Sequence, residues 1–234
     1  MAPFDGACAG TPVDPLELYR WARTLALSVF DDLATLEVAM RSAIARELAA
    51  AYGPEWFRRT DLFDDETLKL IQNAWTIGRI GQLTWPPEVI HGKLVATLMF
   101  GFWVKLLGRG TYQGRGANRK RRIYDSLLWK PAMRNAFPNV GALDRALVET
   151  AARRVQSLRN RIAHHEHIIW GVPLPGERSA DGSVVRLTVT EAHETLMALA
   201  GYVDTGLESW LRQNSAVASH LARCPVPDRT RFHL

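Results

Sequence analysis

The stretch LRNRIAHHEHIIW, residues 158–170, gathers side chains suited to chemistry on phosphodiesters. Histidine ionises near pH 6.5, at about the pH of the cell, so it can take up and release protons without a metal. Arg159 stays charged at any working pH and can stabilise negative charge on phosphate oxygens. Asn160 can position a phosphate or fix the tautomer of an imidazole. Together with His164, these residues predict cleavage of RNA by the 2′-hydroxyl group next to the scissile phosphate.

The helical repeat separates the two adjacent histidines of this stretch. Asn160 and His164 are four residues apart and share one face of a helix. His165 continues the apolar stripe of Val155, Leu158 and Ile162, so it is expected to face the core or an interface. The spacing therefore favours His164 as the general acid and base, with His165 as a possible supporting residue. The alternative is a helix end that carries solvated cations, which the helix dipole itself favours.

A second basic segment, RGTYQGRGANRKRR at 109–122, is rich in glycine and is predicted to be a loop. With Tyr112 and Tyr124 close by, it is a candidate guide for RNA, because cations bind phosphates and aromatic rings stack on bases. The alternative is an ordinary solvated charge run. The predicted RNA-binding residues are Arg115, Arg119, Lys120, Arg121, Arg122 and Arg161.

Other catalytic chemistries lack their motifs in this sequence. No HExxH motif, phosphate-binding GxxxxGK[ST] loop or GxGxxG fingerprint is present. The histidines of HHEH are too closely spaced along a helix to point at one metal ion. The sequence therefore predicts neither a metal nor a cofactor.

The elements that position these residues are predicted to be helical. Apolar residues recur at three- and four-residue steps in 14–52, 64–80, 142–165 and 190–213, and the prolines at 86 and 87 begin another helix that ends at Gly108. Asp64 and Asp65 are cap candidates, and Thr190 is expected to cap the last helix. The fold class is all-α. We expect a flexible N-terminus at 1–13, a single helical domain at 14–214 and a loose tail at 215–234.

The overall composition suits a soluble cytoplasmic protein with an anionic partner. The chain has 234 residues and a formal net charge of +5, which favours an anionic partner, either nucleic acid or a membrane surface. Only two cysteines occur, and the N-terminal residues do not resemble a signal peptide. The most apolar stretch has eleven uncharged residues between Lys93 and Lys105, too few to span a bilayer. No membrane association is expected.

Several motifs together resemble a known family. LRNRIAHHEHI resembles the signature of the HEPN superfamily, with Arg159, Asn160 and His164 at its arginine, polar and histidine positions. TLEVAMRSAIARELAAAYG, GKLVATLMFGFWVKLLG and the region from Trp129 to Phe137 follow the order seen in the Abi-like (abortive-infection) branch of that superfamily. The resemblance covers roughly residues 15–170.

This resemblance implies a HEPN-like helical bundle, here with an additional C-terminal helix. It also implies a metal-independent endoribonuclease that works as a homodimer, with the active site at the subunit interface, in phage defence or as a toxin. An antitoxin or a defence-system partner would accompany such a protein. Some HEPN toxins carry a modifiable tyrosine two residues beyond the histidine; position 166 is Glu here, so that form of control is not expected.

Abi-like proteins also carry a Glu…Arg pair in an early helix, matched here by Glu37 and Arg41. The two are one helical turn apart and can form an ion pair. We expect Glu37 to orient Arg159, with a solvated surface pair as the alternative.

Two other functions fit the same residues. The chain can be a non-catalytic RNA- or protein-binding module that dimerises within a defence complex. It can also be a regulator that binds a mononucleotide phosphate through the same cations.

Overall fold

Helices make up most of this protein. The computed structural model describes residues 2–82 and 86–234, and it is 69% helix and 7% strand. The all-α class is therefore confirmed, although two short β-hairpins accompany the helices. The contacts divide the chain into two compact units, to which helices α2 (Pro15–Tyr52) and α6 (Arg145–Ala163) both contribute residues.

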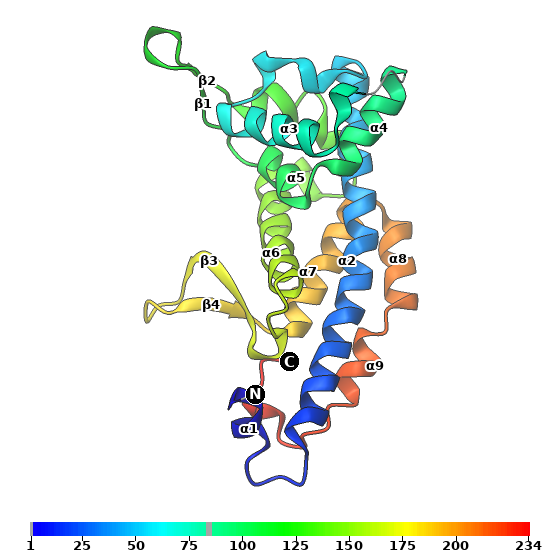
Figure 1. Cartoon of the computed structure of the whole chain (residues 1–234), viewed down its shortest axis with the longest axis vertical. Coiled ribbons are helices and arrows are strands. Elements are labelled where there is room, and N and C mark those ends of the chain that lie inside the picture. The colour runs from blue at the N-terminus through cyan, green and yellow to red at the C-terminus, as the bar shows by residue number, and fades with distance from the viewer. Residues whose placement is uncertain (1, 83–85) are drawn as a thin grey trace. The chain divides into compact units, whose positions relative to one another are not determined.

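The first unit consists of Met1–Leu36, Arg153–Gly201 and Gly206–Leu234. Besides parts of α2 and α6, it contains α1 (Ala2–Cys8), β3 (Val172–Arg178), β4 (Val184–Leu187), α7 (Val189–Val203), α8 (Thr205–Asn214) and α9 (Val217–Ala222), labelled in Figure 1. Its core joins the apolar face of α2 (Leu18, Leu25 and Val29) to Leu158 and Ile162 of α6. The predicted stripe of Val155, Leu158 and Ile162 is thus buried, whereas Leu147, an apolar residue nearer the start of α6, is 49% exposed.

Both ends of the chain pack onto this unit, unlike the flexible N-terminus and loose tail expected from the sequence. Phe4 of α1 is buried in the core, and Arg231 Nη1 donates to the carbonyls of Ala7 and Ala9. His233 N–H donates to Ile169 O and its carbonyl accepts from Val189 N–H, so the tail forms backbone hydrogen bonds to two separate segments. Figure 1 shows α1 and the C-terminus close together. Long-range contacts of this kind leave no local pattern.

The predicted last helix is two helices, α7 and α8, which are separated at Asp204. Its cap is Thr188 and not Thr190. Thr188 Oγ1 accepts from Glu191 N–H at 3.1 Å while Glu191 Oε2 accepts from Thr188 N–H at 2.8 Å. This reciprocal pair is a capping box, which fixes the start of α7.

One buried carboxylate connects three segments of the first unit. Asp32 on α2 is 5% exposed. Its Oδ2 accepts from Ser215 Oγ at 2.6 Å and lies 2.8 Å from His193 Nε2. The hydroxyl of Ser215, just before α9, therefore gives its hydrogen to the carboxylate and not to the imidazole, so the three residues form a structural tie and not a nucleophile–base pair.

The second unit consists of Glu37–Ala152 and Tyr202–Thr205. Its regular elements are α3 (Asp65–Ile77), α4 (Pro87–Thr97), α5 (Phe100–Leu107), the hairpin β1 (Tyr112–Gln113) and β2 (Lys120–Arg121), and short helical turns that include η1 (Trp56–Arg58), η2 (Thr60–Leu62) and a π-helical segment at Asp125–Trp129. Trp56 is fully buried, with ring centroids 6.2 Å from Trp103 and 6.0 Å from Phe63. Trp56 and Trp103, both fully buried, thus serve as core bulk.

The apolar segment at 87–107 is a bent pair of helices. The axes of α4 and α5 differ by 93° across Leu98 and Met99. Within the described ranges, no single helix is long and apolar enough to cross a membrane, and only this bent pair reaches that length and apolarity when taken together.

The predicted loop at 109–122 forms the β1–β2 hairpin, which is fastened to the start of α3. Asp64 caps α3 by accepting from Thr67 N–H, and its other oxygen accepts from both the N–H and the hydroxyl of Thr111, each at 2.9 Å. Gly110 has a φ of +68°, and a Cβ there would lie 2.2 Å from Arg122 O. Only glycine fits this position, so the base of the hairpin is fixed even though its sequence reads as a loop.

Candidate functional site

Helix α6, which carries Arg159 and Asn160, ends in a Schellman motif. His165 N–H donates to Ile162 O at 3.0 Å and Glu166 N–H donates to Arg161 O at 2.8 Å. His165 is therefore the residue after the helix cap and adopts a left-handed conformation, with φ of 58°. Histidine occupies this region more readily than most residues, although glycine is the usual choice. The helix thus stops before the two histidines instead of running through them.

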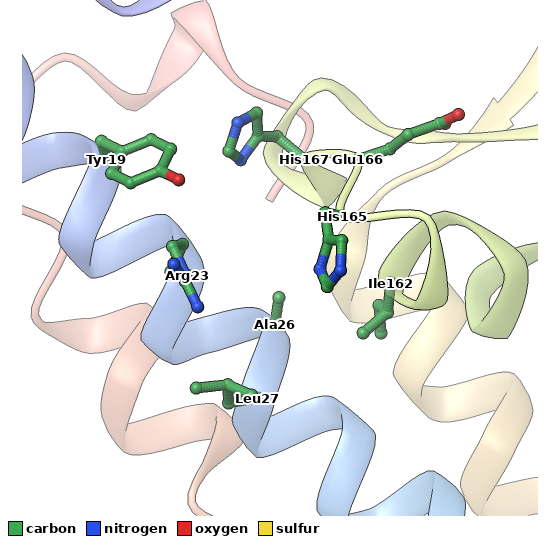
Figure 2. Close-up of a pocket in the computed structure, with 8 residues that line it drawn as sticks. All are labelled: Tyr19, Arg23, Ala26, Leu27, Ile162, His165, Glu166 and His167. Atoms are coloured by element: carbon green, nitrogen blue, oxygen red, sulfur yellow. The ribbon is translucent and has the colours of Figure 1, made fainter.

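A pocket of about 260 Å³ lies at this helix end, entirely within the first unit. Figure 2 shows Tyr19, Arg23 and Leu27 on successive turns of α2, opposite the turn that carries His165 and His167, with the Tyr19 hydroxyl directed toward that turn. The complete lining is Tyr19, Arg23, Ala26, Leu27, Ile162, His165, Glu166 and His167. The pocket brings a cation, a phenol and two imidazoles together, which is a set of groups that can hold an anion and move protons.

The helical stripe predicted that His165 faces the core or an interface, and the structure places it in the lining of this pocket. The stripe reaches Ile162, which is 9% exposed, but the left-handed turn takes His165 out of the helix and leaves it exposed. His164, which precedes the turn, is exposed outside the pocket lining. The two histidines therefore have different surroundings, for a reason that helical periodicity cannot reveal.

The remaining signature residues occupy the last two turns of α6. Asn160 is exposed and its carbonyl accepts from His164 N–H at 2.9 Å, so the two residues share one open face as predicted from their spacing. Arg159 is half-buried on the flank of this face. The assignment of Arg159, Asn160 and His164 as catalytic residues stays a prediction.

Arg161 holds the helix end together. Its guanidinium pairs with Glu166 at 2.9 Å and donates to His167 O at 3.3 Å. Figure 2 shows Glu166 directed away from the centre of the pocket. This engagement gives Arg161 a structural task on the folded turn, whereas the sequence had grouped it with the RNA-binding cations.

Glu37 and Arg41 lie one turn apart on α2, and both are half-buried. They belong to the second unit, whereas Arg159 belongs to the first. The orientation of Arg159 by Glu37 stays a prediction.

His167 sits among aromatic rings at the back of the pocket. Its ring centroid is 4.6 Å from Phe4 and 5.3 Å from Tyr19, both edge to face. Burial, reinforced by the charges of Arg161 and Arg23, lowers the pKa of His167 below its ordinary value. The imidazole is therefore neutral at pH 7, and it fits a packing or hydrogen-bonding role better than that of a cation.

This lowered pKa predicts a pH dependence of stability. The folded protein binds the His167 proton less tightly than the unfolded chain, so stability is complete above about pH 6.5 and falls as the pH drops through that value. We expect the Tm to fall between pH 7.5 and pH 5.5, and to fall by less in His167→Phe, which keeps the edge-to-face packing. Burial also lowers the pKa of His91, so both proteins keep some dependence of stability on pH. Equal falls in the two proteins would contradict this assignment.

The basic hairpin exposes most of the cations that the sequence predicted to bind RNA. Arg115, Arg119, Lys120 and Arg121 are exposed, whereas Arg122 is half-buried and hydrogen-bonded to Gln113 through Nε at 2.9 Å. The guanidinium of Arg119 lies 3.8 Å and that of Arg121 5.1 Å from the centroid of the Tyr112 ring. Four of the five hairpin cations are thus available to phosphates, and Arg122 stabilises the hairpin.

Sequence reasoning missed the α2 side of the pocket. Tyr19 and Arg23 read as ordinary surface positions of an amphipathic helix, and only the tertiary fold places them opposite the end of α6. In the described part of the chain, no three His, Cys, Asp or Glu residues cluster as metal ligands would. Compared with family models, curated proteins and solved structures, the chain matches none.

Proposed function

We propose that this protein is a metal-independent endoribonuclease of the HEPN type. The observation that carries the proposal is the pocket at the end of α6, where Arg23, Tyr19 and His165 meet beside the open face of Asn160 and His164. Cations and imidazoles are the groups that cleavage by a neighbouring 2′-hydroxyl requires. The charge of +5 is consistent with a polyanionic substrate.

In this mechanism His164 removes the proton of the 2′-hydroxyl, whose oxygen then bonds to phosphorus. The imidazole of His164, protonated in that step, then gives a proton to the 5′-oxygen as the bond from phosphorus to that oxygen breaks. The products are a 2′,3′-cyclic phosphate and a free 5′-hydroxyl. Arg159 stabilises the charge on the phosphorus oxygens, and Asn160 positions the substrate. His165 and Arg23, inside the pocket, hold the adjacent phosphate.

The proposal includes a homodimer with the site at the subunit interface. Leu27 at the rim of the pocket is 59% exposed, and Phe30, one turn farther along α2, is 39% exposed. Apolar side chains that cluster on a surface favour burial against a partner. A second copy seated on this face would also add a second set of imidazoles to the cleft. The resemblance to Abi-like proteins suggests a role in phage defence or as a toxin, with an antitoxin or defence-system partner.

The proposal is tested by incubating purified protein with structured and unstructured RNA in EDTA. We expect cleavage that leaves cyclic-phosphate or 3′-phosphate ends and 5′-hydroxyl ends, and a dimeric mass in solution. If folded, dimeric protein left all the RNA substrates intact, the proposed ribonuclease activity would be excluded.

That outcome would favour the second candidate, a non-catalytic RNA-binding module. The observation that supports this candidate is the exposed basic hairpin, because its four available cations and Tyr112 suit binding without requiring any reaction. Such a module would bind RNA with a strong dependence on salt and leave it uncut.

A further inference from the structure

A groove in the second unit runs along one side of α3, from η1 to the hairpin. Its wider part has a volume of about 720 Å³ and reaches Gly114 and Arg115, and its narrower part of about 230 Å³ reaches Arg58 and Trp75. The two parts share Phe57, Ile71 and Gln72, so they form one continuous surface, which we call the α3 groove. The wider part alone falls within the range of roughly 300–1,000 Å³ typical of small-molecule sites.

The floor of the α3 groove is apolar and aromatic. Phe57, Ile71 and Leu68 line it, and the half-buried ring of Trp75 closes its narrow end. A flat, partly apolar ligand can bury one face on such a floor. The bases of nucleic acids have this shape, and stacking on aromatic side chains tolerates all of them.

One amide stands at the centre of this floor. Gln72 is exposed, and its side-chain amide has no hydrogen-bond partner among residues 2–82 and 86–234. An amide offers a donor and an acceptor together, which match the edge of an unpaired base. A fatty or purely aliphatic ligand would leave this group without a partner.

Cations surround the groove on the side of the hairpin. Lys69 and Arg115 line its wide part, and neither makes an ion pair within the described residues. Asp65, the nearest carboxylate in the lining, already accepts from Gly114 N–H at 3.1 Å. Beyond Arg115 the hairpin carries Arg119, Lys120 and Arg121 and no acidic residue. Figure 1 shows its loop projecting away from α3.

From this combination we propose that the α3 groove binds an unpaired nucleotide of single-stranded RNA, with the hairpin bound to the phosphates that follow. The identity of the ligand rests on the proposed function, whereas the position of the site rests on the groove itself. The base packs on the half-buried side chains of Leu68 and Trp75 and meets the amide of Gln72, while Lys69 and Arg115 bind its phosphates. An RNA duplex keeps its bases stacked and paired, so it can use the cations but not the floor.

Binding is measured by fluorescence anisotropy with a labelled single strand and with the same strand annealed to its complement. The protein carries His164→Ala throughout, so that the RNA remains intact. We expect the single strand to bind more tightly than the duplex. Gln72→Ala should weaken binding of the single strand by about three- to tenfold and leave the duplex unaffected.

Paired replacements separate the cations from the base site. The double variant Lys69→Ala/Arg115→Ala should bind both RNAs more weakly. For the single strand, the slope of log affinity against log salt concentration should fall by about 0.7 for each phosphate that is no longer neutralised. The matched control is Lys130→Ala, which removes an exposed cation of the same unit that is paired with Asp125 and lies outside the groove. This control should change the affinity less than twofold.

Two results would overturn the proposal. One is equal binding of single strand and duplex with no effect of Gln72→Ala. The other is tighter binding of polyglutamate than of RNA, which would make the groove a site for acidic proteins. Neither result depends on catalysis. If the groove bound RNA but the protein cut none, only the proposed ribonuclease activity would be disproved.

Discussion

Replacing His164 with alanine should lower the kcat for RNA cleavage by at least about 100-fold, whereas replacing His165 should mainly raise KM, by about tenfold. The first expectation follows from the loss of a general acid and base, which typically costs 10²–10⁴-fold in rate. The second follows from the loss of one hydrogen bond to a phosphate within the pocket. Arg159→Ala should lower kcat by a similar factor to His164→Ala, since it removes a stabilising charge.

The two histidine variants control for each other, because both residues are exposed and adjacent. Cleavage should be measured as initial rates over a range of RNA concentrations, with circular dichroism to confirm the fold. If His165→Ala lost kcat and His164→Ala kept it, the imidazole in the pocket would be the acid–base group. Retention of full activity by both variants would remove the histidines from the mechanism altogether.

Replacing Asp64 with alanine should reduce the free energy of unfolding by about 2–4 kcal/mol, because several hydrogen-bond donors lose their acceptor, at about 1–3 kcal/mol for each one that is buried. Asp64 is 0% exposed and satisfies both the start of α3 and the hairpin at Thr111. Burial alone would raise the pKa of Asp64, but hydrogen bonds from Thr67 and Thr111 outweigh it and hold the pKa below its usual value. The alanine variant leaves the buried N–H of Thr67 and the two donors of Thr111 without their acceptor.

Urea unfolding followed by tryptophan fluorescence measures this loss. The neighbouring Asp65 provides the control, because it also accepts from the hairpin, at Gly114 N–H, but is exposed, so Asp65→Ala should cost less than about 1 kcal/mol. Trypsin should also cut the basic hairpin faster in Asp64→Ala than in the wild type, since its anchor is gone. Similar losses in the two variants would show that the Asp64 network is not specially stabilising.

The sequence predicted the helices well where their bounds depend on residues within the helix itself or next to it. The helix expected at 14–52 is α2, and the cap expected at Asp64 is present, because apolar periodicity and capping act within a few residues. Thr188 was missed as a cap because Thr190 offers an equally suitable hydroxyl, and only the reciprocal bond with Glu191 distinguishes the two.

The candidate site was predictable only along α6. The sequence placed Asn160 and His164 on one face, but the left-handed turn at His165 depends on where the helix stops. That end is set partly by the local ion pair of Arg161 with Glu166 and partly by the burial of Ile168 and Ile169 in the core, which is a tertiary contact. The sequence could not predict that Tyr19 and Arg23 line this pocket, because more than a hundred residues separate them from the turn on its other side.

The tie formed by Asp32, His193 and Ser215 has a consequence for how this protein can change over evolutionary time. A buried carboxylate that loses one partner becomes an unpaired charge, whereas apolar residues of similar volume can replace a whole buried polar group at little cost. Single substitutions at these positions are therefore disfavoured, and combined ones are tolerated. Among homologous chains we expect positions 32, 193 and 215 to covary, either keeping the polar set or replacing it together.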